Sequence, residues 1–169
     1  MSMIDIGVKI ELATTAQSPN TAFAKPTSWK VLRECTSIPA LLQPPSRIST
    51  DYVGDGTIGE LLGKKAATGL DFQFGYDGSS NGTTYGTLLK NDLAGTMHYM
   101  RITLPDGLKM IMLVKLKVTI NSITPSAELT YTLSVIALDP KKQNMTGVPA
   151  ALQDNLVTIV VAGDSDPFA

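Results

Sequence analysis

The chain has 169 residues and a mass of 18.0 kDa, a length that fits one domain, or one domain with arms, and not two full domains. Its residues are 43% hydrophobic and 17% charged, so the chain can bury a core and is not globally disordered. The formal net charge of −1 leaves no bulk basic field to hold a nucleic acid backbone, which disfavours a sequence-reading DNA-binding protein.

Two strands are predicted in the first 35 residues. Residues 6–12 (IGVKIEL) alternate apolar side chains with polar ones or glycine, and residues 29–35 (WKVLREC) form a second extended run. The segment between them is small, polar and rich in turn-forming residues. Because the first dozen residues mix acidic and basic side chains and do not match a signal peptide, we expect the chain to be made in the cytoplasm.

Residues 37–68 form a long segment with few strand signals. It carries Pro39, Pro44 and Pro45 and four glycines, and only short candidates such as 46–52 read as strands. An irregular connection of about 30 residues is uncommon in a compact domain and is usually functional.

One helix is predicted, over residues 84–93 (TYGTLLKNDL), where apolar residues recur at helical spacing and Gly95 is suited to end the helix. Residues 70–76 (LDFQFGY), before it, place three aromatic side chains on one face of a strand. After the helix we expect strands at 97–104, 109–123, 128–139 and 156–162, with Pro105-Asp106-Gly107 as a hairpin turn. The last residues, 163–169, are predicted to be a flexible acidic arm.

The strand at 109–120 has apolar side chains on both faces. One face reads as the core side of an antiparallel sheet: Met110, Met112, Val114, Leu116, Val118 and Ile120. The other face carries Ile111 and Leu113 beside Lys115 and Lys117. Two interpretations are open: the helix at 84–93 covers Ile111 and Leu113 within one sandwich, or a neighbouring subunit covers them.

The next strand repeats this division. Its inward face is predicted to be Leu129, Tyr131, Leu133 and Val135. The other face is small and polar and ends in two apolar residues: Glu128, Thr130, Thr132, Ser134, Ile136 and Leu138.

The chain has little catalytic equipment, since it holds one histidine and one cysteine. We expect His98 to be a surface or satisfied core residue and Cys35 a small buried one. Gly54, Gly56 and Gly59 match a dinucleotide-binding spacing, but the strand and helix that this motif requires are missing around them. We therefore expect no enzyme activity, no cofactor and no metal site.

The order of these elements resembles that of the major tail tube proteins of long-tailed, noncontractile bacteriophages. The resemblance covers residues 6–139 and begins with WKVLRECTSIPALLQPPSRISTD, which contains a bend at Ser37-Ile38-Pro39 and a strand from Ile48 to Asp51. A glycine-rich segment, the LDFQFGYD strand, the single helix, the HYMRITLPDGLKMIML hairpin and the ELTYTLSVIALD strand follow in that order.

The resemblance implies a mainly β fold, an antiparallel β-sandwich or partial barrel over residues 1–162 with one flanking α-helix. It adds a long assembly loop at about 37–68 and terminal arms, one of them at 163–169. It implies a structural subunit whose hexameric rings stack into a hollow conduit for DNA delivery. The implied partners are other copies of the chain, the tail tip or baseplate, the tape measure and the tail terminator, with DNA passing through without specific contact. The implied location is the host cytoplasm before assembly and the virion tail afterwards.

On this interpretation, subunit or ring contacts are expected at two sets of residues, one in the long segment and one on the outward strand faces. They are Ile48, Thr50, Asp51, Tyr52 and Asp55, and Ile111, Leu113, Lys115, Lys117, Ile136 and Leu138. The small polar face of Glu128, Thr130, Thr132 and Ser134 is predicted to line the lumen, with Lys115 and Lys117 off the lumen.

Two alternatives stay open. A tube protein of a contractile tail or of a secretion or injection machine would share the fold. A β-sandwich module that binds sugars or cell surfaces is disfavoured, because only 6% of the residues are aromatic.

Overall fold

A computed structural model describes residues 7–40, 70–76, 84–153 and 156–169, together with the backbone of 47–50 and 59–62. The fold is mainly β, as predicted. The elements, in chain order, are β1 (Lys9–Ala13), β2 (Trp29–Val31), β3 (Cys35–Ser37), β4 (Arg47–Thr50), β5 (Gly59–Leu62), β6 (Leu70–Gly75), α1 (Thr84–Ala94), β7 (Met97–Thr103), β8 (Lys109–Ile120), β9 (Thr130–Leu138), the 3₁₀ turn η2 (Ala150–Leu152) and β10 (Thr158–Val160). No helix in the described part of the chain is long and apolar enough to cross a membrane.

The main sheet is antiparallel, with strand order β2-β1-β7-β8-β9-β6-β3, and β10 pairs with β8 beside this path. The long strand β8 joins two halves of the sheet, β2-β1-β7 on one side and β9-β6-β3 on the other. Its residues from Lys109 to Lys115 pair with β7, and those from Leu113 to Ile120 pair with β9. The two ends of the path, β2 and β3, are consecutive in the chain and are connected by residues 32–34 alone. The sheet therefore folds back on itself and does not extend as one flat layer.

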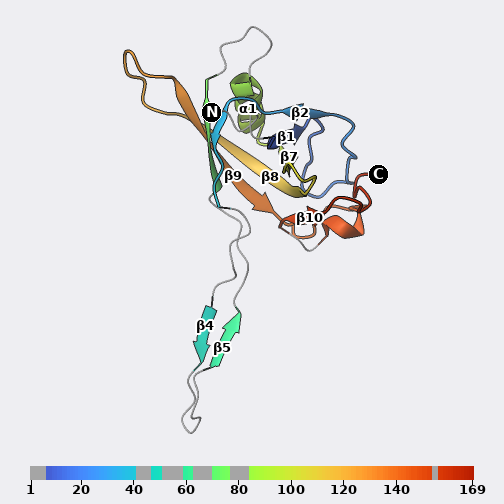
Figure 1. Cartoon of the computed structure of the whole chain (residues 1–169). Coiled ribbons are helices and arrows are strands. Elements are labelled where there is room, and N and C mark those ends of the chain that lie inside the picture. The colour runs from blue at the N-terminus through green and yellow to red at the C-terminus, as the bar shows by residue number, and fades with distance from the viewer. Residues whose placement is uncertain (1–6, 41–46, 51–58, 63–69, 77–83, 154–155) are drawn as a thin grey trace.

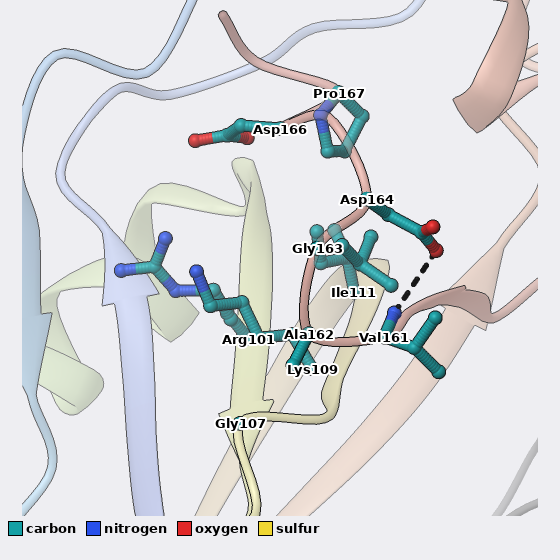
Figure 2. A pocket seen from close by; sticks show the side chains of 11 residues that line it. Arg101, Gly107, Lys109, Ile111, Val161, Ala162, Gly163, Asp164, Asp166 and Pro167 are labelled. Atoms are coloured by element: carbon teal, nitrogen blue, oxygen red, sulfur yellow. Dashed lines mark hydrogen bonds between the residues drawn. The ribbon is translucent and has the colours of Figure 1, made fainter.

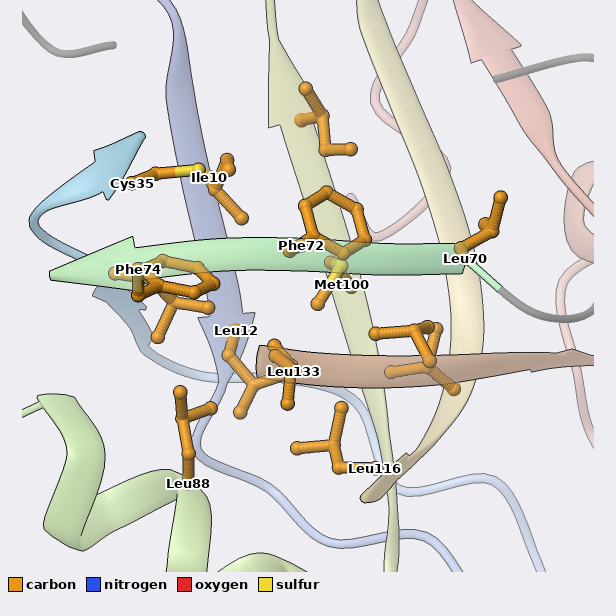
Figure 3. Close-up of a cluster of buried hydrophobic side chains, with 14 of the residues drawn as sticks. Ile10, Leu12, Cys35, Leu70, Phe72, Phe74, Leu88, Met100, Leu116 and Leu133 are labelled. Carbon is orange, nitrogen blue, oxygen red and sulfur yellow. The ribbon is translucent and has the colours of Figure 1, made fainter. Parts of the chain in front are cut away.

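The larger apolar cluster, called the first cluster, lies between the two halves of the sheet. In Figure 3, β6 crosses over β1 and β7, with Phe72 next to Met100, and Leu133 of β9 lies next to Leu12. The first cluster contains most of the side chains that the sequence predicts to face inward from β8 and β9: Met110, Met112, Val114, Leu116, Val118, Tyr131, Leu133 and Val135. Ile120 is instead 43% exposed, because β8 and β9 continue past the cluster as a projecting hairpin (Figure 1).

The strand predicted at 29–35 is broken in the structure. β2 ends at Val31 and β3 begins at Cys35, and Glu34 between them has a φ of 62°, a left-handed conformation that is uncommon outside glycine. The Glu34 carbonyl accepts the Gly75 N–H at 2.8 Å, which fixes the bend against β6. This break lets one chain segment supply both ends of the sheet.

The predicted helix and hairpin turn are both present. Helix α1 ends before Gly95, whose φ is 66°, as expected for a residue that follows a helix C-terminus. In the turn between β7 and β8, Gly107 has a φ of 90° and the Asp106 carboxylate accepts the Leu108 N–H at 3.1 Å.

β4 and β5 form a separate antiparallel ribbon. Arg47 pairs with Leu62 and Thr50 with Gly59, and neither strand pairs with the main sheet. Figure 1 shows the ribbon standing apart from the rest of the molecule. The sequence predicted a short strand here at 46–52. It did not predict β5, because the segment that follows is rich in glycine.

Candidate assembly surfaces

The single histidine and the single cysteine of the chain are both buried. His98 is 3% exposed, and its Nδ1 lies 3.0 Å from the Ala13 carbonyl oxygen, with the Thr96 hydroxyl 2.9 Å from Nε2. A carbonyl oxygen only accepts, so Nδ1 donates to it and Nε2 of the neutral ring accepts from Thr96. Cys35 is also buried, and burial raises the pKa of its thiol to about 11, which leaves almost no thiolate at neutral pH. No cluster of three or more His, Cys, Asp or Glu side chains that could hold a metal occurs in the described residues.

The stability of the fold is expected to fall as His98 becomes protonated. Burial lowers the pKa of His98 from its ordinary value of 6.5, so the unfolded chain takes up the proton first as the pH falls. The free energy of unfolding should therefore be unaffected by this group well above pH 6.5 and should decrease below it, by at most about 1.4 kcal/mol per pH unit. Urea unfolding between pH 7.5 and 5.5 measures this slope. His98 is the only histidine, so the slope should largely vanish in His98→Gln; an equal slope in both proteins would contradict the assignment.

Ile111 and Leu113, predicted to contact another subunit, are each 2% exposed within a single chain. They belong to a second apolar cluster, on the side of β8 that faces away from the first one. Its members are Ala13, Met97, Tyr99, Ile111, Leu113, Met145, Val148, Leu152, Val160 and Phe168. Helix α1 does not form this cover, because its buried residue Leu88 packs in the first cluster. The chain's own C-terminal region covers Ile111 and Leu113, which removes the reason for placing them in a subunit interface.

Phe168 anchors the end of the chain. It is 6% exposed, and the centroid of its ring lies 5.2 Å from that of Tyr99, 5.5 Å from that of Trp29 and 6.4 Å from that of Phe23. The Asp166 carboxylate accepts the Phe168 N–H at 2.9 Å. The predicted arm at 163–169 is therefore held at its end, because Phe168 packs into the second cluster, while residues 163–166 and 169 are exposed.

A small hollow of about 100 Å³ lies beside this cover (Figure 2). Arg101 on its wall is already engaged, since its Nε donates to Glu11 Oε2 at 2.7 Å and its guanidinium carbon lies 4.2 Å from the centre of the Trp29 ring. Asp164 accepts the Val161 N–H at 3.1 Å, the dashed contact in Figure 2. These two charged groups of the hollow thus stabilise β7 and the C-terminal turn.

The outward face of β6, β9 and β8 differs from the prediction of which residues line the lumen. Residues that pair directly in an antiparallel sheet point to the same face. Ser134 pairs with both Lys117 and Asp71, and Ile136 pairs with Lys115. Ser134 Oγ also donates to Asp71 Oδ1 at 2.7 Å. The predicted separation of the small polar face from the two lysines is therefore wrong, because both belong to one surface.

Thr130 and Thr132 belong to a hydrogen-bond network at the base of the projecting β8–β9 hairpin. Asn121 Nδ2 donates to Thr130 Oγ1 at 2.8 Å and to Gln73 Oε1 at 3.3 Å, and Thr132 Oγ1 donates to Asn121 Oδ1 at 2.9 Å. Glu128 is exposed in the loop before β9. The network joins β6 and β9 to the end of β8, and so holds the base of the hairpin to the main sheet.

The other predicted contact residues fall into three groups. Lys115, Lys117 and Ile136 are exposed, whereas Leu138 packs partly against the second cluster. Ile48 and Thr50 lie in β4, where the backbone alone is described. Asp51, Tyr52 and Asp55 lie outside the described residues.

Asp92 is the polar residue that sequence reasoning missed. Its carboxylate accepts the backbone N–H of Val118 in β8 at 2.9 Å, and Lys117 Nζ lies 4.0 Å from the same oxygen. An acidic side chain in the last turn of a helix is disfavoured by the helix dipole, and α1 has no basic residue in that turn. This local conflict is the sequence signal that could have identified Asp92.

A scan of the chain against protein-family models finds no match, and a search of curated proteins finds none.

Proposed function

We propose that the chain is a structural subunit of a bacteriophage tail tube, in which hexameric rings stack into a hollow conduit for DNA. The observation that carries the proposal is the β4–β5 ribbon, which pairs with no other strand of the described chain and stands apart from the main sheet (Figure 1). A two-stranded ribbon is only marginally stable alone in water. A neighbouring copy of the chain supplies the surface that this ribbon needs.

The outward face of β6, β9 and β8 supports the same proposal. It is a polar sheet surface that the C-terminal region leaves uncovered, with exposed Lys115 and Lys117 opposite Ile136 and Ser134. In the tube this surface faces the lumen, now with the lysines included. Exposed Asp71 pairs with Ser134 on the same face and offsets part of the lysine charge, so such a wall holds phosphates weakly and lets DNA slide.

The proposal includes the partners of such a subunit. Copies of the chain form rings and stacks, and the tube ends meet the tail tip or baseplate at one end and the tail terminator at the other. The tape measure protein and then DNA occupy the lumen. The chain has a structural role in the wall of the tube and no enzymatic one, and its final location is the virion tail.

Replacing residues 41–66 with a short Gly-Ser linker tests the proposal. Ser37 at the end of β3 pairs with Gln73 of β6, so a short linker can span the gap and the main sheet should keep its circular dichroism spectrum and melting temperature. The full chain should form hollow tubes at high concentration in negative-stain electron microscopy, and the linker variant should stay monomeric in sedimentation.

Two outcomes would contradict the proposal in different ways. A full chain that stays monomeric at high concentration, even when seeded with tail tips, would contradict the tube function. A linker variant that forms the same tubes as the full chain would remove the ribbon as its support.

A further inference from the structure

The last nine residues, 161–169, form a segment that we call the C-terminal strap, and its hydrogen bonds stay within it. The Asp164 carboxylate accepts the Val161 N–H at 3.1 Å. The Asp166 carboxylate accepts the Phe168 N–H at 2.9 Å. Within the part of the chain that the structure describes, no hydrogen bond or ion pair joins the strap to the rest of the molecule. The strap can therefore move away as a unit without breaking any of these bonds.

Phe168 is the only buried residue of the strap, whereas residues 161–166 are exposed. Its ring fits a slot formed by the rings of Tyr99, Trp29 and Phe23. The hollow of about 100 Å³ has residues of β7 and β8 on one side and strap residues on the other (Figure 2), so the strap is not tightly packed along its length. Contact with the rest of the fold is thus concentrated in one aromatic side chain.

The slot also contains a polar atom that gains nothing when the strap closes. Tyr99 is 1% exposed, and its hydroxyl has no hydrogen-bond partner among the described residues. A buried hydroxyl without a partner costs free energy, because it has given up its hydrogen bonds to water. The Phe168 ring is inclined at 73° to the Tyr99 ring and is part of what keeps water away from that residue. Closure therefore gains ring contacts and loses the hydration of one hydroxyl.

We propose that the C-terminal strap is a latch that opens and closes over the slot while the sheet stays folded, and that the Tyr99 hydroxyl shifts its balance toward opening. Opening withdraws Phe168, gives the hydroxyl access to water and uncovers Ile111 beside the hollow. Closure covers this apolar face of the second cluster again. The strap thus controls whether the face is accessible in the single chain, and this inference does not rest on the proposed tube function.

Release of the two C-terminal residues by carboxypeptidase A, followed by mass spectrometry, measures how often the strap opens. The protease binds an extended chain end, so it cleaves only while Phe168 is out of the slot. The ratio of this rate to the rate for the free peptide VAGDSDPFA gives the open fraction. Tyr99→Phe keeps the ring and removes the hydroxyl, and the open fraction should fall about tenfold, which corresponds to the usual cost of an unpaired buried hydroxyl.

Tyr131→Phe is the matched control. Tyr131 is also 1% exposed, but it lies in the first cluster, so removal of the same atom there should leave the open fraction unchanged. Both variants keep the wild-type C-terminus, and the protease therefore meets the same substrate in all three proteins. In the wild type, release should also depend on urea concentration much less steeply than global unfolding does, because opening exposes little surface.

The outcomes are distinct. If Tyr99→Phe increases the resistance of the chain to urea but leaves the release rate unchanged, the hydroxyl does not act on the strap and the inference is wrong. If Tyr131→Phe slows release as much as Tyr99→Phe does, or if release has the urea dependence of global unfolding, the strap opens only with the whole fold and the inference is overturned. Release from the wild type at the rate of the free peptide would also contradict it, because the strap would then have no closed state.

Discussion

Replacing Phe168 with alanine is expected to lower the free energy of unfolding by about 3–5 kcal/mol, the usual cost of removing a buried phenylalanine ring. The ring contacts Tyr99, Trp29 and Phe23. Tyr99 and Trp29 are held by strands β7 and β2, which limits how far they can collapse onto the space it leaves. The loss also loosens the C-terminal cover over Ile111 and Leu113. Urea unfolding followed by tryptophan fluorescence measures the change, because Trp29 is the only tryptophan.

Val161→Ala is the control for this variant. Val161 lies in the same C-terminal region but is about half exposed, so its truncation should change the free energy of unfolding by no more than about 0.5 kcal/mol. If Phe168→Ala unfolds at the same urea concentration as the wild type, the end of the chain is a free arm, as the sequence alone indicated.

The sequence predicted the strand faces well because a strand repeats every two residues. In β8, the alternation from Met110 to Val118 marks the side chains of the first cluster, and the structure confirms it. The helix was equally readable, since its apolar spacing and Gly95 lie within a dozen residues. These features depend on neighbours in the chain, so local pattern suffices to find them.

The cover over Ile111 and Leu113 could not be predicted in the same way. It depends on Thr158 pairing with Ile111 and on Phe168 reaching Tyr99, contacts between distant parts of the chain. A seven-residue segment with two acidic residues and a single ring reads locally as a tail. Its burial becomes visible only once the second face of β8 is known to be hydrophobic and uncovered.

The error about the lumen has another physical origin, the pairing of strands. The alternation in each strand gives an inward and an outward face, but it does not say that β8 and β9 are neighbours in one sheet. The pairing of Lys117 with Ser134 shows that they are, so the two outward faces form one surface. The Asp71–Ser134 hydrogen bond shows the same face continuing onto β6.

Leu88→Ala is expected to be the second large perturbation, lowering the free energy of unfolding by about 2–5 kcal/mol. Leu88 has no exposed surface and is the buried apolar residue through which α1 enters the first cluster (Figure 3). Leu93→Ala is the matched control, with the same substitution in the same helix at a side chain that is 79% exposed. It should change the free energy of unfolding by less than about 0.5 kcal/mol.

Because Leu88 anchors the helix that holds Asp92 against Val118, Leu88→Ala should do more than weaken the core. It should speed amide exchange at Val118 to a greater degree than in the interior of β6, which lies in the first cluster but does not depend on α1 for its strand pairing. Amide exchange of the two variants under native conditions measures this difference. Equal acceleration at Val118 and in β6 would mean that the helix and sheet open together, and that α1 does not act as a separate cover for the edge of β8.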